Sequence, residues 1–388
     1  MRRRLVALGL VVIAGVSACA DAPAPRADPG GASPAGDLRE RSDLNPLSRS
    51  ALLATKGTPL IDPTELVVGA DFDVIPSVDQ PVTVSRARAD TRLSGTEQVL
   101  LVTHGGQARA YPVRSLIRHE IVNDVIAGLP VAVTWCPLCN TGIAFDRRVN
   151  GKPEVFGVSG GLYRSALVMF DRRTTSLWPQ PLGKAVLGPL LGSELEVLAS
   201  SLLPWSEIRA AHPDVTVALG SQDELASSTN PYEGYDTSAK PFLFRGDVDG
   251  RLPAFTRVAG VTFGSRSTAW SYDLLRRRRV VQATVGGQQL VVLWAPGTAS
   301  PLEGDDVRAG RDVGSTAVYD PRVSGRSLTF SPTGRAGFRD RETGSRWTLT
   351  GMATDGALKG TQLAPLAHQD AFWFAWAAFQ PQTALVTQ

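Results

Sequence analysis

The sequence predicts an α+β protein that is rich in β-strands, has short helices and contains one structural unit twice. Short apolar and β-branched runs bounded by Gly or Pro predict strands, for example at residues 99–103, 131–135 and 289–294. Helices are expected to be fewer and short, at residues 113–122, 204–211 and 372–379, and the first two of these follow or begin with proline. The third observation is an internal repeat, which predicts two pseudo-equivalent copies of the unit.

The repeat becomes visible when two stretches of the chain are aligned. Val102–Trp135 can be laid on Val261–Trp294 without a gap, and 10 of these 34 positions are identical. A later stretch aligns Asp171–Trp178 with Asp340–Trp347. Each copy then has roughly 120 residues, a common length for one domain.

The N-terminus has the pattern of an export signal. Arg2-Arg3-Arg4 precede the apolar run Leu5–Val16, which is too short to span a bilayer. The small residues before Cys19 resemble the lipobox of a bacterial lipoprotein, so residues 1–19 are interpreted as a signal peptide and lipobox, with lipidation at Cys19. The expected location is extracytoplasmic, with a lipid anchor in the bacterial cell membrane. The alternative is an ordinary cleaved signal peptide followed by secretion.

Composition and the repeat together divide the rest of the chain. With 43% hydrophobic and 20% charged residues overall, the chain is able to bury a substantial core. The predicted divisions are a flexible tether at 20–50, an N-terminal lead-in at 51–98, the first copy at 99–230, a connector at 231–257 and the second copy at 258–388. The net charge of +3 with scattered arginines gives no nucleic-acid signature. The membrane is the expected partner through the lipid anchor, and no protein partner is identified.

A close pair of cysteines is the strongest chemical signal, and the repeat acts as its internal control. A residue that only the fold needs should have a similar partner in the other copy, and Trp135 and Pro137 do, because Trp294 and Pro296 match them. The residues without a similar partner are Cys136, Cys139, His104, His119 and Glu120, which align with Ala295, Thr298, Phe263, Arg278 and Arg279. One copy therefore carries reactive side chains that the other lacks.

A transition-metal site is the prediction that we favour from these residues. His119 and Glu120 lie near the end of the predicted helix, and only a short turn and strand lead from there to the cysteines, so the chain is able to return beside its start. Two thiolates with an imidazole suit zinc, and also copper or iron. Cys136, Cys139 and His119 are the predicted ligands, and Glu120 is a further ligand or a partner that orients the imidazole.

Two alternatives use the same cysteines. The first is a thiol–disulfide redox pair, though outside the thioredoxin fold, because residues 140–142 indicate a turn that leads into a strand at 143–145 rather than a helix. Covalent haem is not expected, because Asn140 stands where a c-type site has His. The second alternative is a non-catalytic ligand- or partner-binding protein with a structural disulfide and an aromatic groove near Trp205 or Trp373. The residues alone indicate no reaction and do not decide whether the protein is an enzyme.

Several motifs, taken together, resemble the domain-of-unknown-function family 3179. They are Ala110-Tyr111-Pro112, His119–Asp124, Trp135–Gly142, Phe145-Asp146-Arg147, Phe156–Gly160, Leu167–Arg172, Pro231–Asp236 and Phe372–Trp376. The resemblance extends over most of the chain from about residue 75 onward, with Asn140 departing from the usual glycine. It implies a bacterial exported protein with its site at His119, Glu120, Cys136 and Cys139, and it implies no particular reaction.

Overall fold

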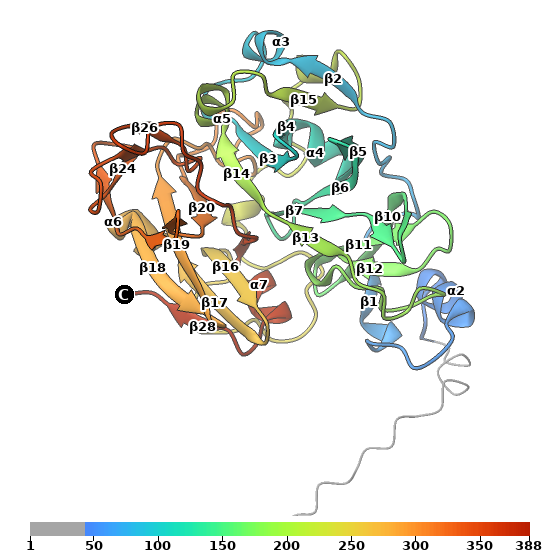
Figure 1. Ribbon diagram of the computed structural model, residues 1–388. Helices are drawn as coiled ribbons and strands as arrows, with labels where there is room; N and C mark the ends of the chain where they lie inside the picture. Colours follow the sequence, from blue (N-terminus) through green and yellow to red (C-terminus); the bar gives the residue numbers. More distant parts are fainter. Residues whose placement is uncertain (1–42) are drawn as a thin grey trace, which may run out of the picture.

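The computed structural model describes residues 43–388 of the chain. Cys19, the predicted signal peptide and most of the predicted tether lie outside the described residues. The described part is rich in β-strands, which form multiple small sheets with several short helices around them (Figure 1). The predicted β-rich class with short helices is therefore confirmed. Within residues 43–388, no helix combines the length and apolar character that a membrane span requires.

The N-terminal segment begins with a capped helix. Helix α2 (Pro46–Ala54) has Pro46 in its first turn, and the side chain of Asn45 accepts a hydrogen bond from Ser48 N at 2.8 Å. The helix thus starts inside the range predicted as a tether. A short 3₁₀ helix, η1 (Pro63–Glu65), follows, and the buried face of α2 packs on a small apolar cluster that includes Leu66 and Val168.

The first half of the molecule, from β1 to β15, contains three sheets and a small hairpin. The largest sheet has five strands in the order β14 (Ser200–Pro204), β3 (Gln98–His104), β4 (Gln107–Pro112), β15 (Thr216–Leu219) and β2 (Val82–Ser85). A second has the order β13 (Glu196–Leu198), β7 (Thr141–Asp146), β6 (Leu129–Cys136) and β5 (Ile121–Ile126). The third has the order β1 (Leu66–Val68), β10 (Phe156–Tyr163), β11 (Ala166–Asp171) and β12 (Leu177–Pro179), and the hairpin is β8 (Arg148–Val149) with β9 (Lys152–Pro153).

The helices of this half are short and sit between strands. They are α3 (Arg86–Asp90), α4 (Val113–His119), α5 (Trp205–Ala211) and the 3₁₀ helices η2 (Gln180–Leu182), η3 (Glu224–Ala226) and η4 (Tyr235–Thr237), the last two following β15. The helix predicted at 113–122 ends at His119, because Glu120 takes a left-handed conformation (φ 57°) and β5 begins at Ile121. The helix predicted at 204–211 is α5.

The second half, from β16 to β28, also contains three sheets and a hairpin. One sheet has the order β27 (Gln369–Phe372), β16 (Arg257–Phe263), β17 (Arg266–Ser271) and β28 (Ala384–Val386), and another has β18 (Val280–Val285), β19 (Gln288–Ala295) and β20 (Ser315–Tyr319). The third has β23 (Phe330–Thr333), β24 (Gly337–Asp340), β25 (Arg346–Trp347) and β26 (Ala353–Asp355), and the hairpin is β21 (Arg322–Val323) with β22 (Arg326–Ser327). The helices are α6 (Tyr272–Arg278) and α7 (Trp373–Phe379), the second of which was predicted at 372–379.

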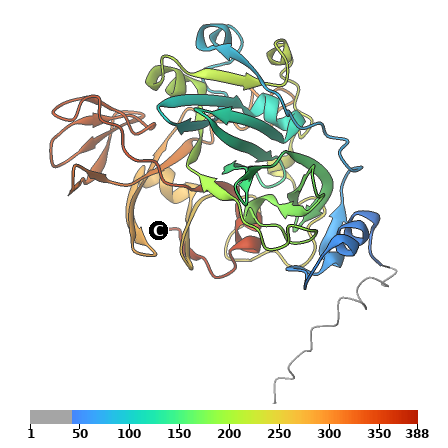
Figure 2. The same cartoon turned by 45° about the vertical axis from the view of Figure 1, so that its right-hand side comes forward.

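The five-stranded sheet joins the two halves because both of its faces are buried. Side chains alternate along its strands, so that Leu100 and Leu202 enter one core while Leu101 and Leu203 enter another. The second core also contains residues from β20 to β26 of the second half, such as Trp347. Figure 2 shows the small sheet β23–β26 at one edge of the molecule, beyond the strands of the second half. The halves therefore share apolar packing as well as the chain between them.

Candidate functional site

The two cysteines lie at a tight turn between adjacent strands. Strand β6 ends at Cys136 and β7 begins at Thr141, and these two residues are partners in the antiparallel register. The turn is closed by a hydrogen bond from Asn140 N to Pro137 O at 3.3 Å, and Asn140 has φ 52°, a left-handed value that Asn tolerates well. A strand rather than a helix follows the pair, as the sequence predicted, so the motif does not have the thioredoxin arrangement.

Both cysteines are free thiols that are buried close together. Cys136 is 1% exposed and Cys139 is 0% exposed, and their sulfurs lie 3.0 Å apart. The backbone N–H of Cys139 donates to Cys136 Sγ at 3.3 Å, and the Cys139 thiol donates to Ser165 O at 3.7 Å. Burial raises the pKa of the Cys139 thiol well above its ordinary value, and Cys136 and the Glu120 carboxylate raise it further.

Glu120 brings a carboxyl group to this buried pair. Its backbone carbonyl accepts a hydrogen bond from Trp135 N at 2.8 Å, which fixes the end of α4 beside the end of β6. The side chain is 7% exposed and its nearest polar partner is the hydroxyl of Tyr232, which donates to Oε1 at 3.4 Å. Burial raises the pKa of Glu120 to about 7, so the carboxyl exchanges its proton near neutral pH.

His119, the neighbouring residue, is held by other groups. Its Nδ1 lies 2.7 Å from Pro76 O, and its Nε2 lies 2.7 Å from a carboxylate oxygen of Glu224. Hydrogen bonding to Glu224 raises the pKa of His119 above its ordinary value. Both ring nitrogens are thus engaged away from the sulfurs, and within residues 43–388 no group of three or more His, Cys, Asp or Glu side chains is arranged to hold a metal ion. Of the four predicted site residues, the structure brings together Cys136, Cys139 and Glu120.

The connector covers the cysteine pair with aromatic side chains. Tyr232 and Tyr235 pack against the core that contains both sulfurs, and Phe242 O accepts a hydrogen bond from Ser165 Oγ at 2.5 Å. Burial raises the pKa of both tyrosines, and the nearby cysteine sulfurs contribute to this rise. The hydroxyls therefore stay protonated and act as hydrogen-bond donors beside the site.

An insertion between β19 and β20 (residues 301–314) holds the connector in this position. Backbone N–H groups of Gly234 and Tyr235 donate to the carbonyls of Glu303 and Leu302 at 2.9 and 3.2 Å. The next residue, Asp236, is buried. It accepts hydrogen bonds from the hydroxyl of Ser300 at 2.6 Å and from the guanidinium groups of Arg257 and Arg311, each at 3.3 Å. The covering tyrosines of the first half thus depend on residues of the second half.

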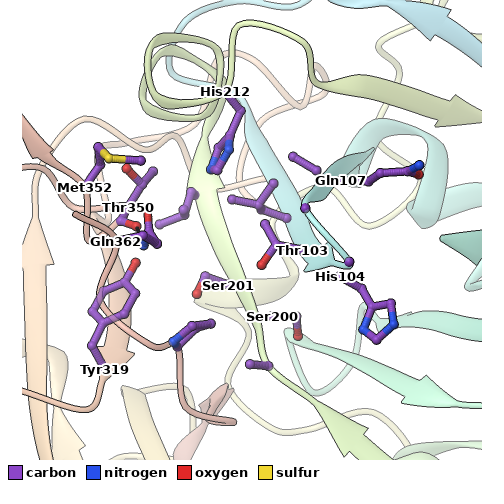
Figure 3. A pocket seen from close by; sticks show the side chains of 17 residues that line it. Thr103, His104, Gln107, Ser200, Ser201, His212, Tyr319, Thr350, Met352 and Gln362 are labelled. Carbon is purple, nitrogen blue, oxygen red and sulfur yellow. Dashed lines mark hydrogen bonds between the residues drawn. The ribbon is translucent and has the colours of Figure 1, made fainter. Parts of the chain in front are cut away.

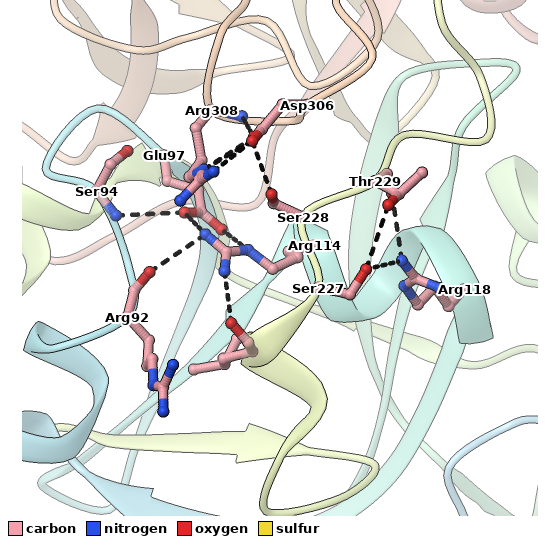
Figure 4. Close-up of polar contacts among 11 residues, drawn as sticks. Arg92, Ser94, Glu97, Arg114, Arg118, Ser227, Ser228, Thr229, Asp306 and Arg308 are labelled. Atoms are coloured by element: carbon pink, nitrogen blue, oxygen red, sulfur yellow. Dashed lines mark hydrogen bonds and ion pairs between the residues drawn. The ribbon is translucent and has the colours of Figure 1, made fainter.

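Helix α4 anchors the chain that leads into the connector (Figure 4). The buried Arg114 side chain pairs with Glu97 and donates to Leu225 O at 2.8 Å, while Arg118 donates to Ser227 Oγ at 2.8 Å. Ser228 then donates to Asp306 of the insertion at 2.7 Å. One helix therefore carries the anchors of the connector on its side chains and Glu120 at its end.

A cavity of about 350 Å³ lies beside the pair. Glu120 and Leu138 line it from the cysteine side, and Tyr232 and Tyr235 line it from the connector. Gly160 of β10 forms part of the wall with φ 71°, and a Cβ atom there would lie 2.2 Å from Ala70 O, so a larger residue does not fit. The lining is mostly apolar, with the carboxyl groups of Glu120 and Glu233 and the hydroxyls of Tyr232, Tyr235 and Ser238, which is the composition of a small-molecule site.

The sequence interpretation missed Ser165 and the two tyrosines of the connector. The segment Pro231–Asp236 was among the motifs of the family resemblance, and that was the available signal for Tyr232 and Tyr235. Ser159, within strand β10, is engaged elsewhere, because its Oγ donates to Val168 O at 2.6 Å. The aromatic groove expected near Trp205 or Trp373 stays a prediction, and both of these indole side chains are 0% exposed.

Comparison with known proteins identifies a family and no characterised relative. The family described as "Protein of unknown function (DUF3179)" matches residues 72–383. No curated protein matches the chain. No solved structure matches it either.

Proposed function

The chain belongs to the DUF3179 family, and from the geometry of its site we propose that it is a thiol–disulfide redox protein that uses Cys136, Cys139 and Glu120. The observation that carries the proposal is the 3.0 Å separation of two free, buried sulfurs beside a carboxyl group whose pKa is about 7. A disulfide needs a sulfur separation of about 2.05 Å, so a movement of about 1 Å closes the bond. The protein's expected place, outside the cytoplasm on a lipid anchor at Cys19, permits such chemistry.

The reaction proceeds by two thiol–disulfide exchanges. The thiolate of Cys136 attacks one sulfur of a partner disulfide, forms a mixed disulfide and releases the first partner thiolate. Cys139 then gives its proton to the Glu120 carboxylate and attacks Cys136 Sγ, which forms the Cys136–Cys139 disulfide and releases the second partner thiolate. The partner gains two electrons and the cysteine pair loses two. Glu120 passes its proton to a departing thiolate, and the second proton comes from the Cys136 thiol.

The donors around the pair support this division of roles. Cys136 Sγ receives the backbone N–H of Cys139 at 3.3 Å, and a hydrogen bond of this kind stabilises a thiolate. Burial raises the pKa of the Cys139 thiol well above the ordinary value, so this thiol needs a base before it reacts. Glu120, with its pKa of about 7, is ionised in about half of the molecules at neutral pH and is suited to that task.

Access to the sulfurs runs through the cavity and the connector. Both sulfurs are covered, and Leu138 with Tyr232 and Tyr235 separate the pair from solvent. A disulfide of a small molecule is able to enter the cavity, whereas a protein disulfide requires the connector to move aside. The hydrogen bonds from Gly234 and Tyr235 to the insertion are the ones that such a movement breaks.

The duplicated unit predicted from the sequence supports a chemical rather than a structural role for the thiols. The strand orders β14-β3-β4-β15 and β27-β16-β17-β28 are alike, and so are β5-β6-β7 and β18-β19-β20. In the second half, Thr298 Oγ1 and Ser315 Oγ lie 2.7 Å apart at positions that align with Cys139 and, through the strand register, with Thr141. We propose that the halves are copies of one unit and that the turn forms without thiols.

The zinc, copper or iron site expected from the sequence stays a prediction. Its predicted ligands are Cys136, Cys139, His119 and Glu120, and of these His119 has both ring nitrogens engaged with Pro76 and Glu224. Two thiolates around zinc in a tetrahedral site lie about 3.7 Å apart, given bonds of about 2.3 Å, so metal binding would widen the observed separation. Metal content measured before and after the double replacement of the cysteines by serine tests this candidate.

Redox titration of the folded protein tests the proposal. The protein is equilibrated in thiol–disulfide buffers of graded potential, quenched by alkylation and analysed by mass, with Cys136→Ser, Cys139→Ser and Glu120→Gln as variants. We expect a two-electron couple above about −300 mV, a trapped mixed disulfide in Cys139→Ser, and slower oxidation near neutral pH in Glu120→Gln. A couple far below about −300 mV would indicate an inert bridge and would reject the proposal.

A further inference from the structure

A second cavity lies where the two halves meet, away from the cysteines. Its volume is about 340 Å³, within the range of small-molecule sites. The floor is one face of the five-stranded sheet, formed by Leu101, Thr103, Ser201 and Leu203, which the register of β3 and β14 places side by side. The opposite wall comes from the second half and includes Tyr319, Thr350, Met352, Gln362 and Pro365 (Figure 3).

Three polar side chains of this cavity lack partners within the protein. Among residues 43–388, no hydrogen bond joins the side chain of Thr103, Ser201 or His212 to another residue. On the opposite wall, the side chains of Tyr319, Thr350 and Gln362 form hydrogen bonds within the second half. Figure 3 shows Thr103 and Ser201 on the side of the first half, with His212 above them and Thr350 and Gln362 opposite. The unused polar groups of Thr103, Ser201 and His212 therefore lie on the side of the cavity that the first half forms.

The lining also limits the charge of a ligand. Within the described part of the chain, no Asp, Glu, Lys or Arg side chain lines this cavity. Burial lowers the pKa of His212 below its ordinary value, so its ring is neutral at pH 7. A charged ligand would lose hydration without gaining a counter-charge, whereas a wholly apolar ligand would leave the hydroxyls unpaired.

We propose that this cavity binds a neutral carbohydrate ring. Such a ring presents hydroxyl groups around its edge and C–H groups on its face, and the cavity offers the hydroxyls of Thr103 and Ser201 and the imidazole of His212 beside the apolar surfaces of Leu101, Leu203 and Pro365. The proposal is independent of the redox function, because none of its residues lines the cavity beside Glu120.

Binding of a defined set of neutral sugars tests the proposal. Glucose, galactose, N-acetylglucosamine, maltose and cellobiose are presented to the purified full chain, and binding is followed by saturation-transfer NMR and then by calorimetry. Ser201→Leu fills the floor of the cavity and is expected to weaken the binding of the best sugar at least tenfold. Thr103→Val removes a hydroxyl at constant shape and is expected to weaken it two- to tenfold.

Two controls separate the site from general damage. Ser267→Leu makes the same change at a half-buried position of β17 that lines neither cavity, and it should leave sugar binding unchanged. Cys136→Ser should also bind sugar as the wild type does, which keeps this test separate from the redox one. The proposal is overturned if no sugar of the set binds at millimolar concentration, or if Ser201→Leu and Thr103→Val both bind as the wild type does.

Discussion

The pH dependence of stability should reveal the buried carboxyl group beside the cysteines. Burial raises the pKa of Glu120 from 4.5 to about 7. Between these pH values the folded protein keeps a proton that the unfolded chain has released, so the free energy of unfolding falls as the pH rises. A difference of about 2.5 pKa units corresponds to a loss of about 3 kcal/mol that is complete by pH 8. Exposure of the side chain is only 7%, so solvent screening reduces this figure little.

The variant Glu120→Gln removes the titration and keeps the shape of the side chain. Guanidinium unfolding of the wild type and the variant at intervals from pH 4.5 to pH 8 measures the difference. We expect similar free energies of unfolding at pH 4.5 and a variant that is more stable by about 3 kcal/mol at pH 8. Glu194→Gln is the control for the loss of a carboxylate, because that side chain is 66% exposed. The reasoning is refuted if the difference in free energy of unfolding between the wild type and Glu120→Gln changes by less than about 1 kcal/mol from pH 4.5 to pH 8.

Three further predictions concern residues around the site and its scaffold. Thr175 has φ 57° where the matching turn of the second half has Gly344, so Thr175→Gly should raise the free energy of unfolding by about 1 kcal/mol and Gly344→Thr should lower it by a similar amount. Denaturant unfolding in which both variants change the free energy in the same direction would contradict this. Arg114→Met leaves Glu97 buried without its partner and should cost about 3–5 kcal/mol, part of which a second change, Glu97→Gln, should restore in a double-mutant cycle. Because the Glu224 carboxylate raises the pKa of His119, the stability that this pair contributes is present below pH 6.5 and is lost as the pH rises through the pKa of the folded protein. His119→Gln should abolish that pH dependence in unfolding experiments and leave the metal content of the protein unchanged. If the variant instead loses bound metal, His119 is a metal ligand after all.

Local sequence patterns were sufficient for the strands and helices that the sequence analysis named. The strands expected at 99–103, 131–135 and 289–294 are β3, β6 and β19, because apolar, β-branched runs between turn residues determine where a strand begins and ends. The end of α4 was misplaced by three residues, since the helix stops at a non-glycine residue in the left-handed conformation. No propensity signals a stop of that kind.

The composition of the site depends on contacts between residues that are far apart in the sequence, and local sequence patterns do not predict such contacts. His119 was expected beside the cysteines because the chain returns there, yet Glu224, more than 100 positions further on, holds its ring. Tyr232 reaches Glu120 because hydrogen bonds to the insertion position the connector, and that insertion follows a strand of the second half. Pairings of this separation are set by the packing of the halves, so local patterns do not predict them.

The matching position in the second half separates the requirements of the backbone from those of the chemistry. Arg279 has φ 60° and caps α6, just as Glu120 has φ 57° and caps α4, so the fold imposes this strained conformation whatever the side chain. The Arg279 guanidinium donates a hydrogen bond to Gly334 O and lies over the ring of Phe338. Glu120 instead buries a carboxyl group with no cation beside it and with one long hydrogen bond to Tyr232, at the cost in stability estimated above. A group that the fold does not need, and that destabilises the protein at neutral pH, is best explained by the sulfurs it faces.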